Sequence, residues 1–308
     1  MKVLAISGGT KNGSNDSICR EALLAAQACG AETAFIRLLD LNLKYCTGCG
    51  ACMKSLNVGQ GGGCIQKDDF QWLRDQILDA DSVLFSMPVF EKGLPGVFHT
   101  VLDRFGPGND WGTNKLGTEM SEKVNGRFPD QRLFRQKTVA FLGTGGTDYT
   151  TMFQCTCSML AMLMRWDVLE CDVFQWTTCF PVEDERVQRV HRLGEALASP
   201  ERRGERINSG VCPHCGCSNF YLYPDGRGEC CLCGIKGRLI SGGDGLQFVF
   251  PQEQLQHAAD TESGKLRHAM DIRENQQRRG KIRQSEKFRK CQQRYQKVLP
   301  LKPEHEKA

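Results

Sequence analysis

The sequence predicts an α/β fold built on a doubly wound parallel five-stranded sheet. Along the first 200 residues, short apolar runs of strand length alternate with segments whose apolar residues recur about every 3.6 positions. Parallel strands need crossover connections of this kind, because the chain must return to the starting edge before it can pair in the same direction. The first apolar run also leads directly into a polar, glycine-rich loop, which is typical of open sheets that bind a ligand beyond the strands' carboxyl ends.

The predicted elements follow one another in a regular order. The five apolar runs expected to form strands are residues 3–6, 33–38, 82–86, 138–142 and 168–174. The segments with helical spacing are residues 17–29, 70–78, 97–104, 151–164 and 187–197. Residues 106–135 show no clear period and are rich in Gly, Asn and Pro, so we expect a long insertion there before the fourth strand.

The chain is expected to contain two domains and a tail. Residues 1–200 would form the α/β domain, including a cysteine loop at 46–64, residues 201–250 a small metal module, and residues 251–308 a basic, partly helical or disordered tail. The net charge of +4 is unevenly spread, since residues 252–308 carry +6 and the rest of the chain −2. The basic character therefore belongs to the tail, for which nucleic-acid binding is the less favoured alternative to a solvated helix.

The number of cysteines is informative about the cellular compartment in which the protein is expected to work. The chain has 17 cysteines in 308 residues, and in a reducing compartment clustered thiols hold metals more often than they form disulfides. The first apolar run is too short for a signal peptide, and no stretch approaches the ~20 apolar residues of a membrane span. We therefore expect a soluble cytoplasmic protein that does not contact a membrane.

Four cysteines lie in one glycine-rich turn, at Cys46, Cys49, Cys52 and Cys64. Three thiolates at three-residue steps can converge on one iron-sulfur cube only where small residues let the backbone fold tightly, and glycines at positions 48 and 50 meet that need. A [4Fe-4S] cluster is the favoured interpretation. The alternatives are a zinc or empty thiol site and a coincidence of spacing.

A second cysteine group has the pattern of a zinc ribbon. Two Cys-x-x-Cys-Gly turns, here called knuckles, supply Cys212 with Cys215 and Cys230 with Cys233. Each knuckle presents two thiolates, and a hairpin between them can complete a tetrahedron around structural zinc. Rubredoxin-like iron uses the same ligand set, but the short spacer favours zinc. His214 is expected to face solvent, and Cys217 and Cys231 are expected to be bystanders.

The loop after the first strand has the composition of a phosphate-binding loop. Its candidate ligand groups are Ser7, Gly9, Thr10, Asn12, Gly13, Ser14, Asn15 and Ser17. Such a segment can turn several backbone N–H groups and hydroxyls toward one anion, while the N-terminus of the following helix adds partial positive charge. Neither dinucleotide-binding nor Walker spacing is present. The alternative is an ordinary turn between a strand and a helix.

Two further loops are expected at the same sheet edge, where residues 86–90 and 143–146 close the third and fourth strands. These two loops and the first loop together resemble the corresponding loops of a known family. The resemblance also includes the cysteine turn, the Asp68-Asp69 pair that follows it, and the helix ending at Asp103-Arg104. It is the iron-sulfur flavoprotein branch of the flavodoxin-like NADPH-dependent FMN reductases. The resemblance covers about residues 1–180.

This resemblance implies a flavodoxin-like fold that binds FMN by its phosphate at the first loop. The flavin ring would be lined by Met87, Pro88, Val89, Phe90, Thr144, Gly145, Gly146 and Thr147. Phe90 stands where the family usually has Tyr. The resemblance also implies a homodimer or homotetramer in which the cluster of one subunit approaches the flavin of another.

The function predicted from these features is an FMN-dependent oxidoreductase or electron-transfer flavoprotein. Electrons would pass between NAD(P)H or a ferredoxin-type donor and an acceptor that the sequence does not identify, and no side chain need act as a catalytic acid or base. One alternative is a redox-responsive regulator that binds nucleic acid or a protein through the ribbon and tail. Another is a cluster-free quinone, nitro or flavin reductase.

Overall fold

The computed structural model describes residues 1–177, 179–180, 184–199, 210–242 and 245–298. It contains a five-stranded parallel sheet in the order β2-β1-β3-β4-β5. The strands are β1 (Lys2–Ser7), β2 (Glu32–Arg37), β3 (Ser82–Pro88), β4 (Thr138–Thr144) and β5 (Asp167–Phe174). All four neighbouring pairs are parallel. This strand order is that of the flavodoxin-like doubly wound fold, so the predicted fold class is confirmed.

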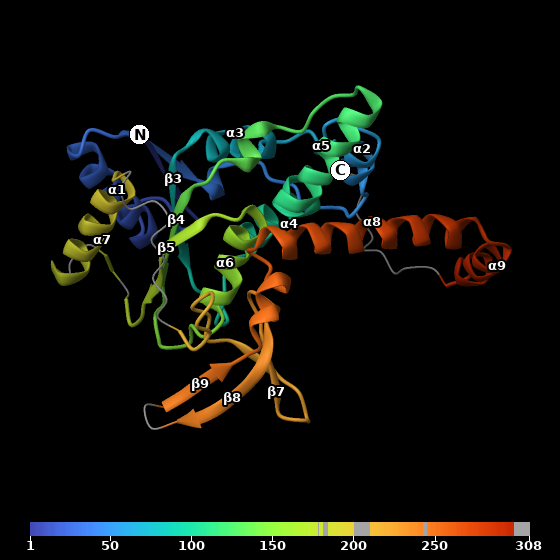
Figure 1. Cartoon of the computed structure of the whole chain (residues 1–308). Coiled ribbons are helices and arrows are strands. Elements are labelled where there is room, and N and C mark those ends of the chain that lie inside the picture. Colours follow the sequence, from blue (N-terminus) through green and yellow to red (C-terminus); the bar gives the residue numbers. More distant parts are fainter. Residues whose placement is uncertain (178, 181–183, 200–209, 243–244, 299–308) are drawn as a thin grey trace.

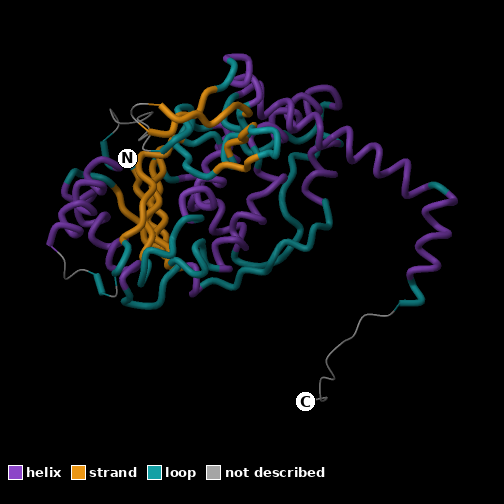
Figure 2. The backbone as a smooth tube through the Cα atoms, turned by 90° about the horizontal axis from the view of Figure 1, so that it is seen from below, coloured by secondary structure: helices purple, strands orange, loops and turns teal. Residues whose placement is uncertain are grey.

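Helices cover both faces of this sheet (Figures 1 and 2). One face packs against α1 (Ser14–Ala28) and α7 (Asp184–Leu197), and the other against α3 (Phe70–Asp79), α4 (Gly96–Asn109) and α6 (Phe153–Met164). Strand residues alternate between the two cores, with Val3 and Ala5 in one and Leu4 and Ile6 in the other. A sheet buried on both faces explains why its strands read as continuous apolar runs.

The prediction of a loop-like insertion at residues 106–135 is wrong. This stretch contains the end of α4, the helix α5 (Trp111–Val124) and a short 3-10 helix, η2 (Gln131–Phe134). Asp110 caps α5 by accepting a hydrogen bond from the amide of Thr113. The buried face of α5 is made largely of small and polar residues, including Gly112, Asn114 and Ser121. An apolar period is therefore missing from the sequence even though the helix is packed.

The C-terminal part forms a smaller antiparallel sheet followed by two helices. Its strands are β6 (Phe220–Leu222), β7 (Arg227–Cys230), β8 (Lys236–Gly242) and β9 (Gly245–Val249), in that order. The 3-10 helix η4 (Gln252–His257) connects them to α8 (Glu262–Gln284) and α9 (Glu286–Tyr295). The expected boundary between the first two domains, at residues 200 and 201, and the end of the tail lie outside the described residues.

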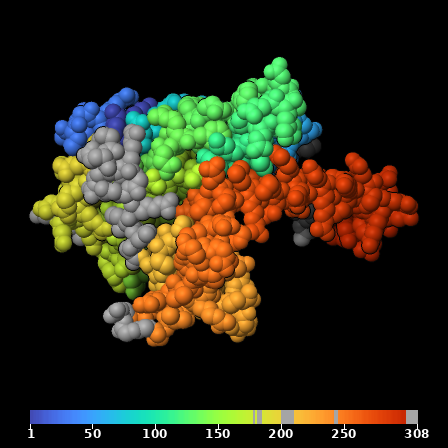
Figure 3. All heavy atoms as spheres, viewed as in Figure 1, coloured from blue at the N-terminus to red at the C-terminus, as the bar shows by residue number. Residues whose placement is uncertain are grey.

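The described part of the tail, residues 251–298, is helical. Its first part packs against the rest of the protein, whereas a solvated helix was expected. The N-terminal half of α8 lies along α5, whereas α9 projects away from the body (Figures 1 and 3). In the second half of α8, Gln276 is hydrogen-bonded to Asn57 of α2 (Ala51–Asn57). The contact is polar, which is why low apolar content did not indicate it. Among the described helices, none is long and apolar enough to cross a membrane.

Candidate functional site

The three loops predicted to bind a cofactor meet at one edge of the large sheet. Parallel pairing places Ser7 beside Ser86. The backbone hydrogen bonds continue beyond the strands, since the amide of Gly8 donates to the carbonyl of Ser86 and the amide of Val89 donates to the carbonyl of Thr144, both at 2.9 Å. The loops after β1, β3 and β4 are therefore neighbours at the carboxyl ends of the strands, where this fold binds its ligand.

The first loop ends at an uncapped helix N-terminus. Gly13 precedes α1 and no side chain caps the helix there. The amide groups of Ser14, Asn15 and Asp16 donate no hydrogen bond to any residue that the structure describes. The Thr10 hydroxyl lies against the same point, because a Cβ added to Gly13 would come within 2.8 Å of Thr10 Oγ1. Unpaired amides at the positive end of a helix fit the phosphate of FMN.

Asn15 ties the three loops together beneath this edge. Its side chain is buried, and Nδ2 donates to Ser86 Oγ at 3.1 Å while Oδ1 accepts from Thr144 Oγ1 at 3.2 Å. The side chain is thus engaged by the protein, and any contact of Asn15 with a cofactor would come from its backbone amide. The hydrogen bond between Asn15 and Thr144 joins residues that are 129 positions apart in the chain.

The predicted contacts differ in accessibility. Ser7, Gly9, Asn15, Met87, Thr144 and Gly145 are buried; Gly13, Ser14, Ser17, Pro88 and Val89 are half-buried; Thr10, Asn12, Phe90, Gly146 and Thr147 are exposed. The ring of Phe90 is 61% exposed, and Tyr149, just beyond the third loop, is 53% exposed. The edge therefore presents open aromatic surface beside the candidate cofactor loops.

A buried ion pair supports the first loop from below. Arg37 Nη2 lies 2.6 Å from Asp16 Oδ2, and the carboxylate also accepts from the amide of Asn12 at 2.8 Å. Burial by itself would raise the pKa of Asp16, but the hydrogen bonds from Arg37, Ser7 and the Asn12 amide lower it on balance. Asp16 is therefore ionised and holds the loop at its turn.

The four upstream cysteines line one cavity of about 210 Å³. Cys46, Cys49 and Cys64 are exposed and Cys52 is half-buried. Gly108 of α4 approaches so closely that a Cβ there would lie 2.9 Å from the Cβ of Cys52. Two thiolates on one tetrahedral zinc ion lie about 3.8 Å apart. Within the part of the chain that the structure describes, no three of these four sulfur atoms lie within 4.8 Å of one another, so the set is more open than the ligands of a single ion.

Arg104 forms the inner wall of this cavity. Its side chain is 1% exposed and makes a double hydrogen bond with Asp68, Nη1 to Oδ2 at 2.6 Å and Nη2 to Oδ1 at 2.9 Å. Hydrogen bonding from Arg104 lowers the pKa of Asp68 to about 2. Burial would lower the pKa of Arg104, but Asp68 and the nearby Cys64 raise it.

One atom of Arg104 remains without a protein partner. Its Nε is buried and donates no hydrogen bond to any described residue. A buried donor left unpaired beside four thiols fits a group that brings its own acceptors, such as the sulfides of an iron-sulfur cluster. The residues of the cavity thus fit a [4Fe-4S] cluster on Cys46, Cys49, Cys52 and Cys64.

Replacing Asp68 by Asn should reduce stability in a pH-dependent manner. Because the pKa of Asp68 is about 2 in the folded protein, its charge contributes about 2 kcal/mol at pH 7, and about 1 kcal/mol of this is lost by pH 3. The sign follows from a lowered pKa: the contribution is present above the unfolded value and lost as pH falls. Urea unfolding of both proteins at pH 7 and pH 3 measures the difference.

Asp69→Asn is the matched control for this prediction. Asp69 is the neighbouring carboxylate, and it accepts a hydrogen bond from the exposed amide of Asn42 at 2.7 Å. An asparagine oxygen can still accept that bond. A gap between wild type and Asp68→Asn that stays constant from pH 7 to pH 3 would contradict the assigned role.

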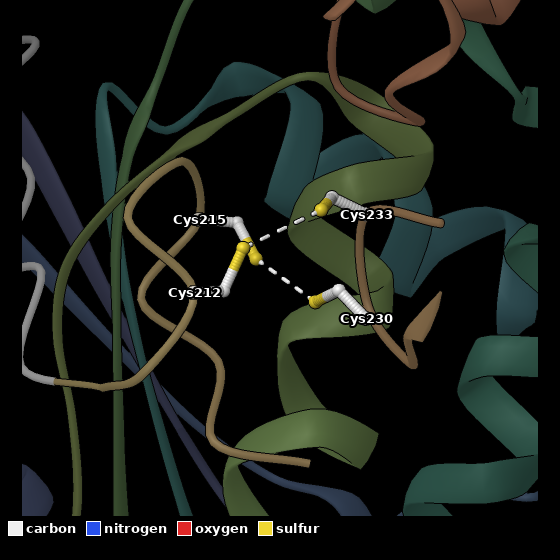
Figure 4. Close-up of side chains that lie close together, drawn as sticks. All are labelled: Cys212, Cys215, Cys230 and Cys233. Atoms are coloured by element: carbon white, nitrogen blue, oxygen red, sulfur yellow. Dashed lines mark hydrogen bonds between the residues drawn. The ribbon is translucent and has the colours of Figure 1, made fainter. Parts of the chain in front are cut away.

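The second cysteine group forms a compact set. The sulfur atoms of Cys212, Cys215, Cys230 and Cys233 all lie within 4.8 Å of one another. The Sγ atoms of Cys212 and Cys233 are 3.8 Å apart, and those of Cys215 and Cys230 are 3.5 Å apart. Figure 4 shows the two knuckles pointing their sulfurs toward one centre. These separations fit a single tetrahedral metal ion.

The sequence also led to predictions for three residues near this group, His214, Cys217 and Cys231. The expectation that His214 faces solvent is wrong, because its Nε2 lies 2.7 Å from Asp260 Oδ1 and its side chain is 19% exposed. The histidine thus links a knuckle to the segment that leads into α8. Cys217 is buried beside Cys155 in the ribbon core and Cys231 is exposed.

Sequence reasoning did not assign Arg104 or Asp68 as site residues, although both belong to the segments that carried the resemblance. Their pairing joins α4 to the loop after the cysteine turn, across 36 positions. The available clue was an arginine at the end of a helix together with acidic residues after a cysteine cluster. Nothing comparable in the sequence indicated that α8 would line the cysteine cavity.

Comparisons with known proteins agree with this geometry. The model of the family described as NADPH-dependent FMN reductase matches residues 1–166. A solved structure described as a flavone reductase is 43% identical, covers 99% of this chain and 100% of its own, and superposes with a TM-score of 0.88.

Two curated relatives are informative. Flavone synthase cfoJ of Aspergillus candidus is 28% identical over 298 residues, which is 91% of each chain. An iron-sulfur flavoprotein of Archaeoglobus fulgidus is 26% identical over 152 residues, 49% of this chain and 65% of the relative. The family match covers more than half of the 308 residues, so the chain belongs to the NADPH-dependent FMN reductase family and is a flavin-dependent oxidoreductase.

Proposed function

We propose that this protein uses FMN and a [4Fe-4S] cluster to move electrons between NAD(P)H, or a ferredoxin-type carrier, and a planar organic acceptor. The observation that carries the proposal is the cysteine cavity. Its four thiols do not form a compact set like that of the ribbon, and the buried Nε of Arg104 has no partner among the described residues. A cluster-free reductase, with zinc at both cysteine groups, leaves both features unexplained.

The residues proposed to hold FMN follow from the sheet edge. The phosphate would accept from the amides of Ser14, Asn15 and Asp16 and from the Thr10 hydroxyl. The segment from Met87 to Phe90 and the segment from Thr144 to Thr147 would position the ring, with Asn15 keeping the loops in register. No residue is assigned as a catalytic acid or base.

The two groups would supply complementary chemistry. When bound, FMN can take up a hydride as two electrons and a cluster carries one electron at a time, so together they connect two-electron and one-electron reactions. The protein's part is to hold the loops, keep Arg104 charged beside the thiols and leave one side of the site open to the acceptor.

A flavone-type compound is the acceptor class we favour. Two similar proteins that match more than nine-tenths of this chain have names that refer to flavones. The exposed rings of Phe90 and Tyr149 lie beside the candidate flavin loops, and aromatic faces of this kind favour flat polyphenols. Reduction or formation of a carbon–carbon double bond next to a carbonyl would suit hydride transfer.

We also propose zinc for the ribbon, a homodimer or homotetramer, a cytoplasmic location, and a division into domains 1–200 and 201–250 with a tail at 251–308. Zinc is supported by the close sulfur spacing and the short spacer between knuckles.

The experiment is FMN titration of the wild type and of Thr10→Val under anaerobic conditions, followed by addition of NADPH or reduced ferredoxin. The wild type should bind FMN and be reduced by one of the two donors, after which a flavone should reoxidise it. Thr10→Val has the same shape but lacks a hydroxyl that hydrogen-bonds a charged phosphate. It should therefore bind FMN about tenfold or more weakly.

Thr33→Val is the matched control. Thr33 pairs with Val3 near the amino ends of β1 and β2, whereas the candidate FMN loops lie at the carboxyl ends of the strands. This variant should therefore bind FMN like the wild type. Equal FMN affinity of all three proteins would refute the phosphate assignment. A wild type that does not bind FMN would refute the proposal as a whole.

A further inference from the structure

The cysteine cavity has an outer wall from the far end of the chain. Gln276 and Arg279 of α8 line it together with the four cysteines and Arg104. Gln276 is also joined to α2, since its Oε1 accepts a hydrogen bond from Asn57 Nδ2 at 2.7 Å, across 219 positions. The helix that begins with Ala51 and contains Cys52 is therefore directly connected to α8.

This wall is held by polar contacts with α5. Lys265 Nζ lies 2.8 Å from Asp110 Oδ2, with both side chains almost fully buried. About two turns further along α8, Arg273 Nη2 donates to the carbonyl of Leu116 at 3.1 Å. Gly112 allows the close approach, because a Cβ there would lie 2.4 Å from the carbonyl oxygen of Lys265. A buried ion pair of this kind fixes the helix position, since either partner alone would be costly to bury.

The two positive groups at the cavity differ in their partners. Arg104 is neutralised by Asp68. Arg279 is exposed, and no described carboxylate lies within ion-pair distance of it. Asp103 is the carboxylate among the residues that line the cavity, but it forms no ion pair with Arg279, so it offsets this positive charge only at a distance. The adjacent Arg278 does not line the cysteine cavity and lies only in the groove between α8 and α9.

We propose that α8 is the outer wall of the cluster site and that Arg279 is a positioning residue that raises the reduction potential of the cluster. This inference rests on the proposed [4Fe-4S] cluster. Reduction adds one negative charge to the cluster, and a nearby cation that forms no ion pair stabilises that charge. Gln276 keeps α8 against α2, so that this cation stays at the cavity and solvent entry is limited.

The test is an anaerobic redox titration of the cluster, followed by electron paramagnetic resonance, in the full-length protein at low ionic strength. At a fixed potential, Arg279→Gln should lower the ratio of reduced to oxidised cluster about fivefold, a shift of about −40 mV for a one-electron couple. Arg279→Lys should restore most of the wild-type value. Arg278→Gln is the matched control and should titrate like the wild type. Added salt should shrink the Arg279→Gln shift.

A second variant tests the wall itself. Gln276→Leu removes the bond to Asn57, so iron should pass to an external chelator severalfold faster than in the wild type, at equal initial iron content. A fully loaded Arg279→Gln protein with unchanged potential would overturn the inference and leave the proposed function intact. Absence of iron and sulfide from the wild type would overturn the cluster proposal and this inference with it.

Discussion

Replacing Cys49 by Ser is expected to abolish the iron-sulfur cluster and to leave FMN binding intact. Wild-type protein prepared without oxygen should contain about four iron and about four acid-labile sulfide per chain, and the variant almost none. The backbone amide of Ala51 and the hydroxyl of Thr47 lower the pKa of Cys49, which favours the ligating thiolate. Its side chain is exposed, so the substitution leaves no cavity in the core.

Cys29→Ser provides the control, because Cys29 is also exposed but lies at the end of α1, away from the cavity. This variant should keep its iron, its sulfide and the visible absorption of the cluster. Metal analysis also separates the alternatives. One zinc with four iron per chain supports the proposed arrangement, whereas two zinc and no iron would mean that the cysteine cavity holds zinc despite its open spacing.

Replacing Cys233 by Ser is expected to release the ribbon metal and unfold the small sheet. Binding of structural zinc is worth about 10 kcal/mol or more in small modules, and this one buries few apolar side chains apart from its cysteines. Hydrogen exchange should show loss of protection across β6 to β9, with the large sheet unaffected. The loss should reach the start of α8, because the amide of Ala259 donates to the carbonyl of Cys233 at 2.9 Å.

Cys231→Ser is the matched control within the same knuckle. Cys231 is exposed and lies outside the four-cysteine set, whereas Cys233 is fully buried in it. The control should retain one zinc per chain and wild-type protection. Full zinc content in Cys233→Ser would show that this cysteine is not a ligand.

The two cysteine groups differ in how far local sequence specifies them. In the ribbon, each pair of thiols is set by a four-residue turn, and the two turns are joined by a short hairpin. Spacing alone therefore identified all four members of the set that the structure brings together. In the cysteine cavity, spacing identified the thiols, but the surrounding charges come from α4 and α8 and could not be inferred from the turn.

Most helices and strands of the first domain could likewise be predicted from the sequence. The expected strand at residues 138–142 is β4 (Thr138–Thr144), and the expected helix at 70–78 is α3 (Phe70–Asp79). These elements bury strongly apolar faces, which impose a clear period on the sequence. The helix α5 was missed because it packs through glycine, threonine, asparagine and serine against a polar partner, and such a face leaves no apolar period.

The sequence alone was thus sufficient to predict the doubly wound sheet, the loops at its edge and the four-cysteine set of the ribbon, because short-range periodicity and spacing encode them. Three features could be recognised only in the tertiary structure. They are the hydrogen bonds by which Asn15 joins the loops, the Arg104–Asp68 ion pair, and the wall of the cysteine cavity formed by Gln276 and Arg279 of α8. Each of these joins polar residues from separate elements. Hydrogen bonds and ion pairs depend on distances of a few ångströms between such residues, and a linear pattern carries no information about those distances until the core has packed.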